Sequence, residues 1–176
     1  GITVNAAGAS TLVLAGFPSS VIAGTAGTVT VTARDAFGNV ATSYAGSVTF
    51  TSSDAQATLP ATTTLTSGTR TFAGGVTLKT AGTRSITATD TVAGSLTSTQ
   101  SGITVAAASA TTLALQTPAA VLAGVPFSVT ITARDPYGNI DTGYPARSAS
   151  LLAAYTLATT PTAVPRRRAA QDPAPR

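Results

Sequence analysis

The sequence repeats itself at an interval of about one hundred residues. Gly1-Ile2-Thr3-Val4 recurs as Gly102-Ile103-Thr104-Val105, which lies 101 positions later. The stretch from Thr30 to Val40 recurs from Thr130 to Ile140, one hundred positions later, with the residues Arg-Asp-x-aromatic-Gly-Asn at its centre. A unit of this size is a whole domain rather than one turn of a solenoid. The chain is therefore expected to be cut from a tandem array of domains, with its first residues ending a preceding unit.

Within one unit, apolar and polar residues alternate with a period of two. Val29, Val31 and Ala33 alternate with threonines, and the same pattern recurs in three further segments, 47–51, 76–79 and 85–89. Such alternation predicts strands with one buried face and one face toward water. Turn residues separate about seven such strands between Ser10 and Val105. This spacing predicts an all-β fold, an antiparallel β-sandwich of the immunoglobulin-like (Ig-like) class.

The predicted organisation has four parts. Residues 1–7 are the end of a preceding repeat and a linker, and residues 8–105 form one complete sandwich. Residues 106–145 form a partial second repeat, joined to the first by the linker 106–109. Residues 146–176, rich in Ala, Pro and Arg, are predicted to be a disordered tail. The first domain is expected to be stable and the second segment labile.

Composition excludes most enzyme chemistry. The sequence contains no His and no Cys, so it lacks a Ser-His-Asp triad, a thiolate nucleophile and an ordinary zinc site. No side chain is spaced to activate a Ser, Asp or Tyr nucleophile. We therefore expect no enzyme activity, no catalytic residues, no cofactor-binding residues and no metal-binding residues. No apolar run approaches the roughly 18 residues of a membrane-spanning helix, so no membrane insertion is expected.

The net charge of +4 lies in the last part of the chain. Residues 1–145 contain five basic and five acidic side chains, whereas the tail contains five arginines and one aspartate. A surface that binds nucleic acid normally spreads its basic side chains over a folded face. Because the predicted domains are neutral, no nucleic-acid partner is expected. A basic arm for an anionic polymer is an alternative interpretation of the tail.

The segment Arg34–Asn39 and its copy Arg134–Asn139 form the clearest motif. One interpretation is a calcium site, with Asp35 and Asn39 supplying oxygen atoms. The favoured interpretation is a turn, in which Asp35 caps the loop, Gly38 adopts a positive φ, and Phe37 or Tyr137 covers the edge of the core. One carboxylate and one amide are few ligands for a dedicated calcium site. A weak cation site shared by adjacent repeats is the remaining alternative.

Two weaker motifs are interpreted as structural. Leu59-Pro60-Ala61-Thr62-Thr63 resembles a sortase sorting signal, but its fifth residue is not Gly, and it is expected to be a loop. Lys79, the only lysine, is considered for an isopeptide bond with an Asn. Its register with the outward Thr77 instead places it on the outer face of a strand.

The alternating segments and the Asp-x-aromatic-Gly-Asn turn resemble bacterial Ig-like repeats of the invasin and intimin type. Filamin-like repeats share the same strand pattern. The resemblance implies a structural spacer or adhesion repeat, located at the cell surface or secreted, with neighbouring Ig-like repeats of the same chain as its partners. The alternative function is a module that binds a host or envelope glycan or protein through its end loops. Phe50, Phe72 and Phe127 fall at inward positions, which leaves Phe17, Phe37 and Tyr137 as exposed aromatic candidates.

The repeat pattern stops at Pro145. Codon degeneracy allows residues 145–153 to be encoded so that reading from the third base gives Gly-Thr-Val-Ser-Phe-Thr-Ser-Ser, close to the segment 46–53. A single-base deletion near codon 145 would therefore explain the tail as a frame-shifted extension. The DNA sequence decides this hypothesis, which fails if neither alternative reading frame continues the repeat.

Overall fold

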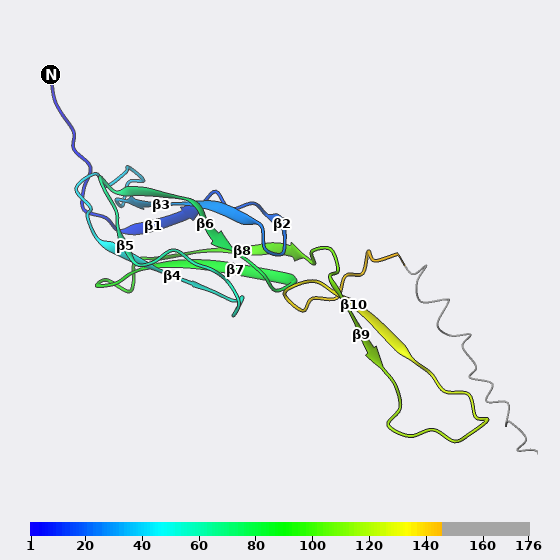
Figure 1. Cartoon of the computed structure of the whole chain (residues 1–176). Coiled ribbons are helices and arrows are strands. Elements are labelled where there is room, and N and C mark those ends of the chain that lie inside the picture. Colours follow the sequence, from blue (N-terminus) through cyan, green and yellow to red (C-terminus); the bar gives the residue numbers. More distant parts are fainter. Residues whose placement is uncertain (146–176) are drawn as a thin grey trace, which may run out of the picture. The chain divides into compact units, whose positions relative to one another are not determined.

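The computed structural model describes residues 1–145, and these contain ten strands and no helix (Figure 1). The all-β prediction is confirmed for this part of the chain. Nothing in the described part is a helix able to span a bilayer. The predicted tail 146–176 lies outside the described residues. The strands are β1 Thr11–Ala15, β2 Ser20–Ile22, β3 Ala26–Arg34, β4 Ser47–Ser52, β5 Thr63–Thr64, β6 Thr69–Thr77, β7 Gly82–Asp90, β8 Thr97–Ala106, β9 Thr112–Gln116 and β10 Thr130–Arg134.

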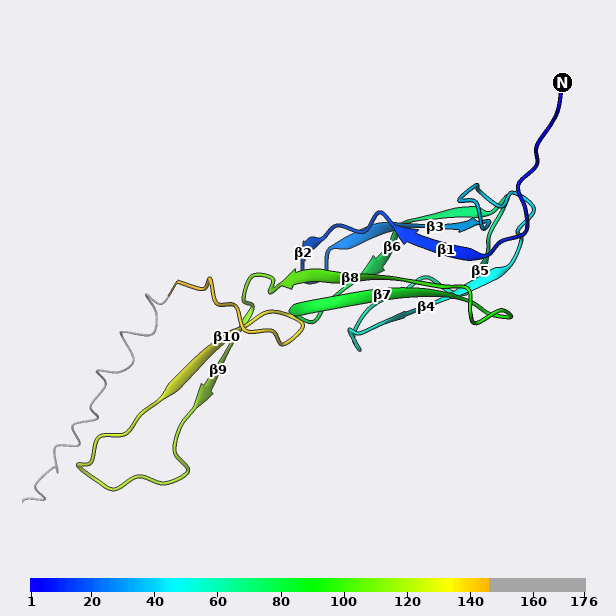
Figure 2. The ribbon, with the colours of Figure 1, turned by 180° about the vertical axis from the view of Figure 1, so that it is seen from behind.

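The strands form three sheets. One has three strands in the order β1-β3-β6, one has five strands in the order β2-β8-β7-β4-β5, and β9 and β10 pair with each other. Strands β1 to β8 number eight, rather than the predicted seven or so, because the short β2 and β5 add to the longer strands that the alternation identified. Figure 2 shows the same strands from behind.

The prediction of a purely antiparallel arrangement is wrong at β2. After β1 the chain leaves the three-stranded sheet, and β2 pairs in parallel with β8, Val21 lying opposite Val105. Only three residues of β2 take part, and they follow a Gly16-Phe17-Pro18 bend that the alternation pattern could not reveal. The five-stranded sheet is therefore mixed.

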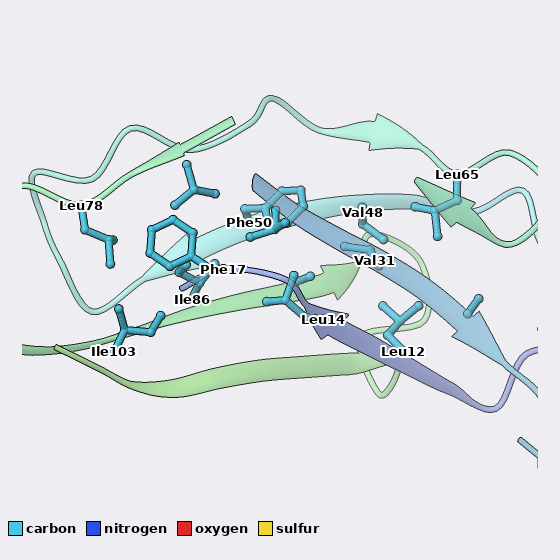
Figure 3. Packing of buried hydrophobic residues seen from close by; sticks show 14 of the residues in the cluster. Leu12, Leu14, Phe17, Val31, Val48, Phe50, Leu65, Leu78, Ile86 and Ile103 are labelled. Carbon is cyan, nitrogen blue, oxygen red and sulfur yellow. The ribbon is translucent and has the colours of Figure 1, made fainter. Parts of the chain in front are cut away.

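Side chains from the three-stranded and the five-stranded sheet contribute to one hydrophobic cluster (Figure 3). Strand β3 shows the predicted alternation, since Val29, Val31 and Ala33 are fully buried and the threonines between them are not. The Phe50 and Phe72 rings meet edge to face with centroids 4.9 Å apart, a favourable geometry for aromatic pairs. The buried members are Leu12, Leu14, Phe17, Ala23, Val29, Val31, Ala33, Ala41, Val48, Phe50, Leu65, Val76, Leu78, Ile86, Ala88, Ile103 and Val105.

Phe17 is buried in this cluster, so its prediction as an exposed aromatic is wrong. Its ring lies over Gly27, where a Cβ atom would collide with it. Gly27 sits next to a bulge in the pairing of β3 with β6. The absence of a side chain at this position therefore makes room for the ring, a long-range relation that the local sequence does not show.

The outer faces of the strands carry pairs of hydroxyl groups. Thr30 faces Thr71 across β3 and β6, and Thr87 faces Thr99 across β7 and β8, with hydroxyl oxygens 2.9 Å and 2.8 Å apart. Cross-strand threonine pairs of this kind contribute to sheet stability. Further pairs join Thr32 to Thr69, Thr89 to Thr97, and Ser47 to Thr64.

The hairpin of β9 and β10 repeats the pairing of β1 and β3. Leu113 lies opposite Ala133 as Leu12 lies opposite Ala33. However, Leu113 is 53% exposed, whereas Leu12 is 5% exposed. Phe127, predicted to point inward, is likewise 53% exposed. The described part of the second repeat contains no counterpart of β4 to β8, so no opposing sheet covers these side chains.

The core makes a first testable prediction. Replacing the fully buried Ile86 by Ala removes three methyl or methylene groups from the space between the sheets. We expect the free energy of unfolding to fall by about 2–5 kcal/mol, measured by denaturant titration. The matched control is Val92→Ala, because Val92 is 94% exposed, and it should change stability by less than about 0.5 kcal/mol. Equal effects of the two substitutions would contradict the packing described here.

Candidate functional site at the junction of the repeats

The Asp-x-aromatic-Gly-Asn motif folds as a turn in both repeats. In the second repeat, Asp135 Oδ1 accepts hydrogen bonds from the backbone N–H groups of Tyr137 and Asn139, at 2.9 Å and 2.8 Å. Gly138 has a φ of 87°, a conformation that favours glycine. In the first repeat, Asp35 and Gly38 make the equivalent turn, with a φ of 85°. The sequence therefore predicts this turn correctly.

The same carboxylate holds the linker that enters each repeat. Asp135 Oδ2 accepts a hydrogen bond from Ala108 N, and Asp35 Oδ2 accepts one from Ala7 N, both at 3.0 Å. The second donor to each Oδ2 is the Asn side chain of the motif, Asn139 or Asn39. Each carboxylate oxygen thus accepts two N–H donors. The carboxylate oxygens that a calcium ion would need are already hydrogen-bonded, which favours a turn over a cation site.

Asn139 also binds the preceding repeat. Its Nδ2 donates to the backbone carbonyl of Lys79, and its Oδ1 accepts the backbone N–H of Ala81, both at 2.8 Å. The residues Lys79–Ala81 form the loop between β6 and β7 of the first repeat. A side-chain amide that both donates to and accepts from one loop pairs with it as another backbone segment would.

Tyr137 lies on the same end of the first repeat. Its ring is half-buried, packs against the hydrophobic cluster, and lies so close to Gly24 that a Cβ there would overlap it. Gly24 has a φ of 85°, which a residue with a side chain rarely adopts. Phe37, the equivalent residue of the first repeat, is 82% exposed. Phe37 is therefore exposed, as predicted for a candidate binding aromatic, and does not cover the edge of the core. Tyr137 does cover an edge of the hydrophobic cluster, so its prediction as an exposed aromatic is wrong.

A second buried carboxylate shapes the loop that Asn139 binds. Asp54 Oδ2 accepts the backbone N–H groups of Lys79 and Thr80, at 2.6 Å and 2.9 Å. The guanidinium group of Arg84 donates to the carbonyls of Thr80 and Ala81, at 3.0 Å and 2.7 Å. With the two bonds to Asn139, every backbone N–H and C=O of Lys79–Ala81 has a partner. A loop so fully hydrogen-bonded presents a defined surface.

We call the loop Lys79–Ala81 together with Gly24 the socket, and the pair Tyr137 and Asn139 the plug. The plug comes from a turn fixed by Asp135, and the socket from a loop fixed by Asp54. Backbone amides and neutral side chains make the polar contacts between them. The Thr80 hydroxyl of the socket also donates to Asp54 Oδ1, at 2.6 Å. This arrangement can join two domains.

The buried carboxylates are stabilised as anions. Burial alone would raise the pKa of Asp135, but the Asn139 side chain and the backbone N–H groups of Ala108, Asn139 and Tyr137 lower it below its usual value. Asp35 and Asp54 follow the same rule, with burial opposed by side-chain and backbone donors that lower their pKa. Burial also opposes ionisation of Asp90, whose pKa is lowered by the Tyr44 hydroxyl and the N–H groups of Ala93 and Val92.

The two weaker sequence motifs lie in loops of the first repeat. Of the segment that resembles a sorting signal, residues 59–62 form a loop, as predicted, and Thr63 begins β5. The Nζ of Lys79 donates to the Thr58 hydroxyl at 2.9 Å, while its backbone carbonyl belongs to the socket. Within residues 1–145, no group of three or more His, Cys, Asp or Glu side chains is placed to hold a metal ion.

Comparison of the chain with family models, curated proteins and solved structures gives no match. The junction therefore has to be interpreted from its own geometry and from the internal repeat. Sequence reasoning placed Asn139 in a turn but missed its bonds to the first repeat, because nothing local to Asn139 indicates Lys79. The available signal was the recurrence of both the Asn and the aromatic residue in each repeat.

The plug makes a second prediction, with a matched control in the same chain. Asn139→Ala removes the bond to Asp135 and both bonds to the socket, whereas Asn39→Ala removes only the corresponding bond to Asp35. We expect Asn139→Ala to lower protection of the Ala81 amide by about 1–3 kcal/mol, the net value of two hydrogen bonds. Hydrogen exchange followed by NMR measures this. If Asn39→Ala reduced Ala81 protection equally, the plug assignment would be wrong.

Acid sensitivity gives a third prediction. Because the folded pKa values of Asp35, Asp54, Asp90 and Asp135 lie below the unfolded value of about 3.9, the unfolded chain takes up protons first. Their contribution is complete above about pH 4 and is lost as the pH falls through the lower folded values. We expect the free energy of unfolding to change little from pH 7 to 5 and to fall below about pH 4. Asp54→Asn should reduce this dependence, and a gain of stability in acid would refute it.

Proposed function

We propose that this chain is a segment of a tandem of Ig-like β-sandwich repeats that acts as a non-catalytic spacer in a bacterial surface or secreted protein. The observation that carries the proposal is the pair of 2.8 Å hydrogen bonds between Asn139 and the loop Lys79–Ala81. They join consecutive repeats through a motif that both repeats contain. A domain whose repeated internal turn binds its neighbour is suited to an array.

The Ig-like sandwich is the part of this proposal that concerns the fold. It is supported by two sheets whose buried faces share one hydrophobic cluster, and by the alternation of buried with less buried residues in β3 and β7. The resemblance to invasin and intimin repeats supplies the rest, including the location at the cell surface. Outward-facing threonine hydroxyls and a sequence without Cys are compatible with that location.

The spacer mechanism follows from how the junction restricts the linker. Ala108 is tied to Asp135 of the repeat that follows, and Ala106 accepts a bond from Ala23 of the repeat that precedes. Only one residue, Ala107, lies between these anchors, and Asn139 adds two further bonds. A linker anchored on both sides cannot behave as a free coil. Each added repeat would then extend the array in a fixed direction relative to the last.

A ligand-binding module is the alternative function, and one observation favours it. Phe37 is 82% exposed on an end turn, and exposed aromatic rings are common in binding sites. A glycan array probed with the whole chain tests this alternative. Binding that Phe37→Ser abolishes would support a ligand-binding module, whereas a blank array would favour the spacer.

The spacer proposal makes a fourth prediction. Because the sequence has no Cys, spin labels can be attached at Ala73→Cys in β6 and Gln116→Cys in β9, both exposed positions. We expect electron–electron distance measurements to give one narrow distribution. Asn139→Ala should broaden it, and Asn39→Ala should not. A broad distribution in the otherwise unaltered chain would overturn the proposed spacer.

A further inference from the structure

The first repeat has its own equivalents of the plug residues, Phe37 and Asn39, and among the described residues no socket binds them. Phe37 and Asn39 belong to a turn whose internal bonds match those of the second repeat, from Asp35 to Gly38. Among the described residues, the Asn39 side chain has one hydrogen bond, to Asp35, whereas the Asn139 side chain has three. Asn39 is exposed and Asn139 is half-buried. The difference between the two turns is the presence of a preceding repeat.

We propose that Phe37 and Asn39 form a docking surface for the socket of another copy of this repeat, joined upstream in the same chain. This inference rests on the proposed tandem function and specifies the partner. The ring of Phe37 would lie over the glycine equivalent to Gly24, as Tyr137 does in the second repeat. The side chain of Asn39 would pair with the loop equivalent to Lys79–Ala81.

The linker before the first repeat supports this occupant. Ala7 N reaches Asp35 at the same 3.0 Å as Ala108 N reaches Asp135, so the chain enters both turns by the same contact. A preceding repeat attached to residue 7 would therefore be tethered next to Phe37. The linker contact exists although no preceding sheet is present in the described residues.

The first four residues give an independent argument. Ile2 and Val4 are 96% and 87% exposed, whereas Ile103 and Val105, their counterparts at the end of β8, are 0% and 2% exposed. Two apolar side chains in a Gly-Ile-Thr-Val segment are suited to the last strand of a sheet. Such a sheet in a preceding repeat would cover them and bring its socket next to the Asp35 turn.

A second, separate copy of the chain is a poorer occupant than an upstream repeat. The socket of the first repeat already holds Tyr137 and Asn139. In the second repeat, Gly124 corresponds to Gly24, and the described residues include no counterpart of the loop Lys79–Ala81. Two chains therefore have a free plug but no free complete socket between them, so docking requires a repeat added before residue 5.

The fifth prediction uses an extended chain, in which a copy of residues 1–105 is joined directly to Asn5 of the full sequence. Spin labels are attached at Ala73→Cys in the added copy and at Ala15→Cys in the original first repeat. Ala15 is the position equivalent to Gln116, so this pair spans the new junction as the Ala73 and Gln116 pair spans the existing one. We expect a narrow distance distribution that matches that of the Ala73 and Gln116 pair. Phe37→Tyr should preserve it, whereas Phe37→Ser and Asn39→Ala should broaden it.

The outcomes separate the docking surface from the spacer. If the extended chain gives a broad distribution that Asn39→Ala leaves unchanged, while the Ala73 and Gln116 pair stays narrow, the docking inference is overturned and the spacer proposal survives. If both pairs are broad, the spacer proposal fails as well. Circular dichroism of each variant shows whether it is folded. If the Asn39→Ala variant is unfolded, Phe37→Ser decides alone, because the Phe37 ring is 82% exposed and its replacement leaves the hydrogen bonds of the turn in place.

Discussion

The organisation of this protein depends on one interaction, the fourfold hydrogen bonding of a buried aspartate that directly follows β3 in the first repeat and β10 in the second. Asp135 binds two backbone N–H groups of its own turn, the linker at Ala108 and the side chain of Asn139. Burying a carboxylate is costly unless donors replace its water. Here the replacement donors come from the turn, the linker and the Asn side chain. The hydrogen bonds that compensate for burial of the carboxylate therefore also fix these segments relative to one another.

Asn139 extends this hydrogen-bond network to the neighbouring repeat, where a second buried aspartate, Asp54, fixes the loop that Asn139 binds. Asp54 accepts hydrogen bonds from the backbone N–H groups of the loop, and Arg84 donates hydrogen bonds to its carbonyls. Two fixed loops can meet with little loss of conformational freedom, because most of that freedom was lost when each repeat folded. The contact between repeats can therefore be small and still directional.

The sequence predicted the elements whose cause is local. Alternation located β3, β4 and β7, and the Asp, Gly and Asn residues identified the turn. Prediction from the sequence failed for residues and strands whose contact partner lies far away along the chain. Phe17 is buried because Gly27 leaves room for it, and β2 pairs in parallel with β8. Phe37 is exposed, whereas the equivalent Tyr137 packs against the first repeat. The junction contains both kinds of feature. The turn could be predicted from its local residues, but the hydrogen bonds from Asn139 to Lys79 and Ala81 could not.

The threonine pairs on the outer faces have a consequence for the environment in which such repeats can work. Attractions between surface charges weaken as dissolved ions accumulate, but hydroxyl pairs such as Thr30 with Thr71 and Thr87 with Thr99 carry no charge. They have no proton to gain or lose near neutrality either. The contribution of these pairs to sheet stability should therefore be the same in fresh water and in brine. An array built from such sheets would stay folded at either salt concentration.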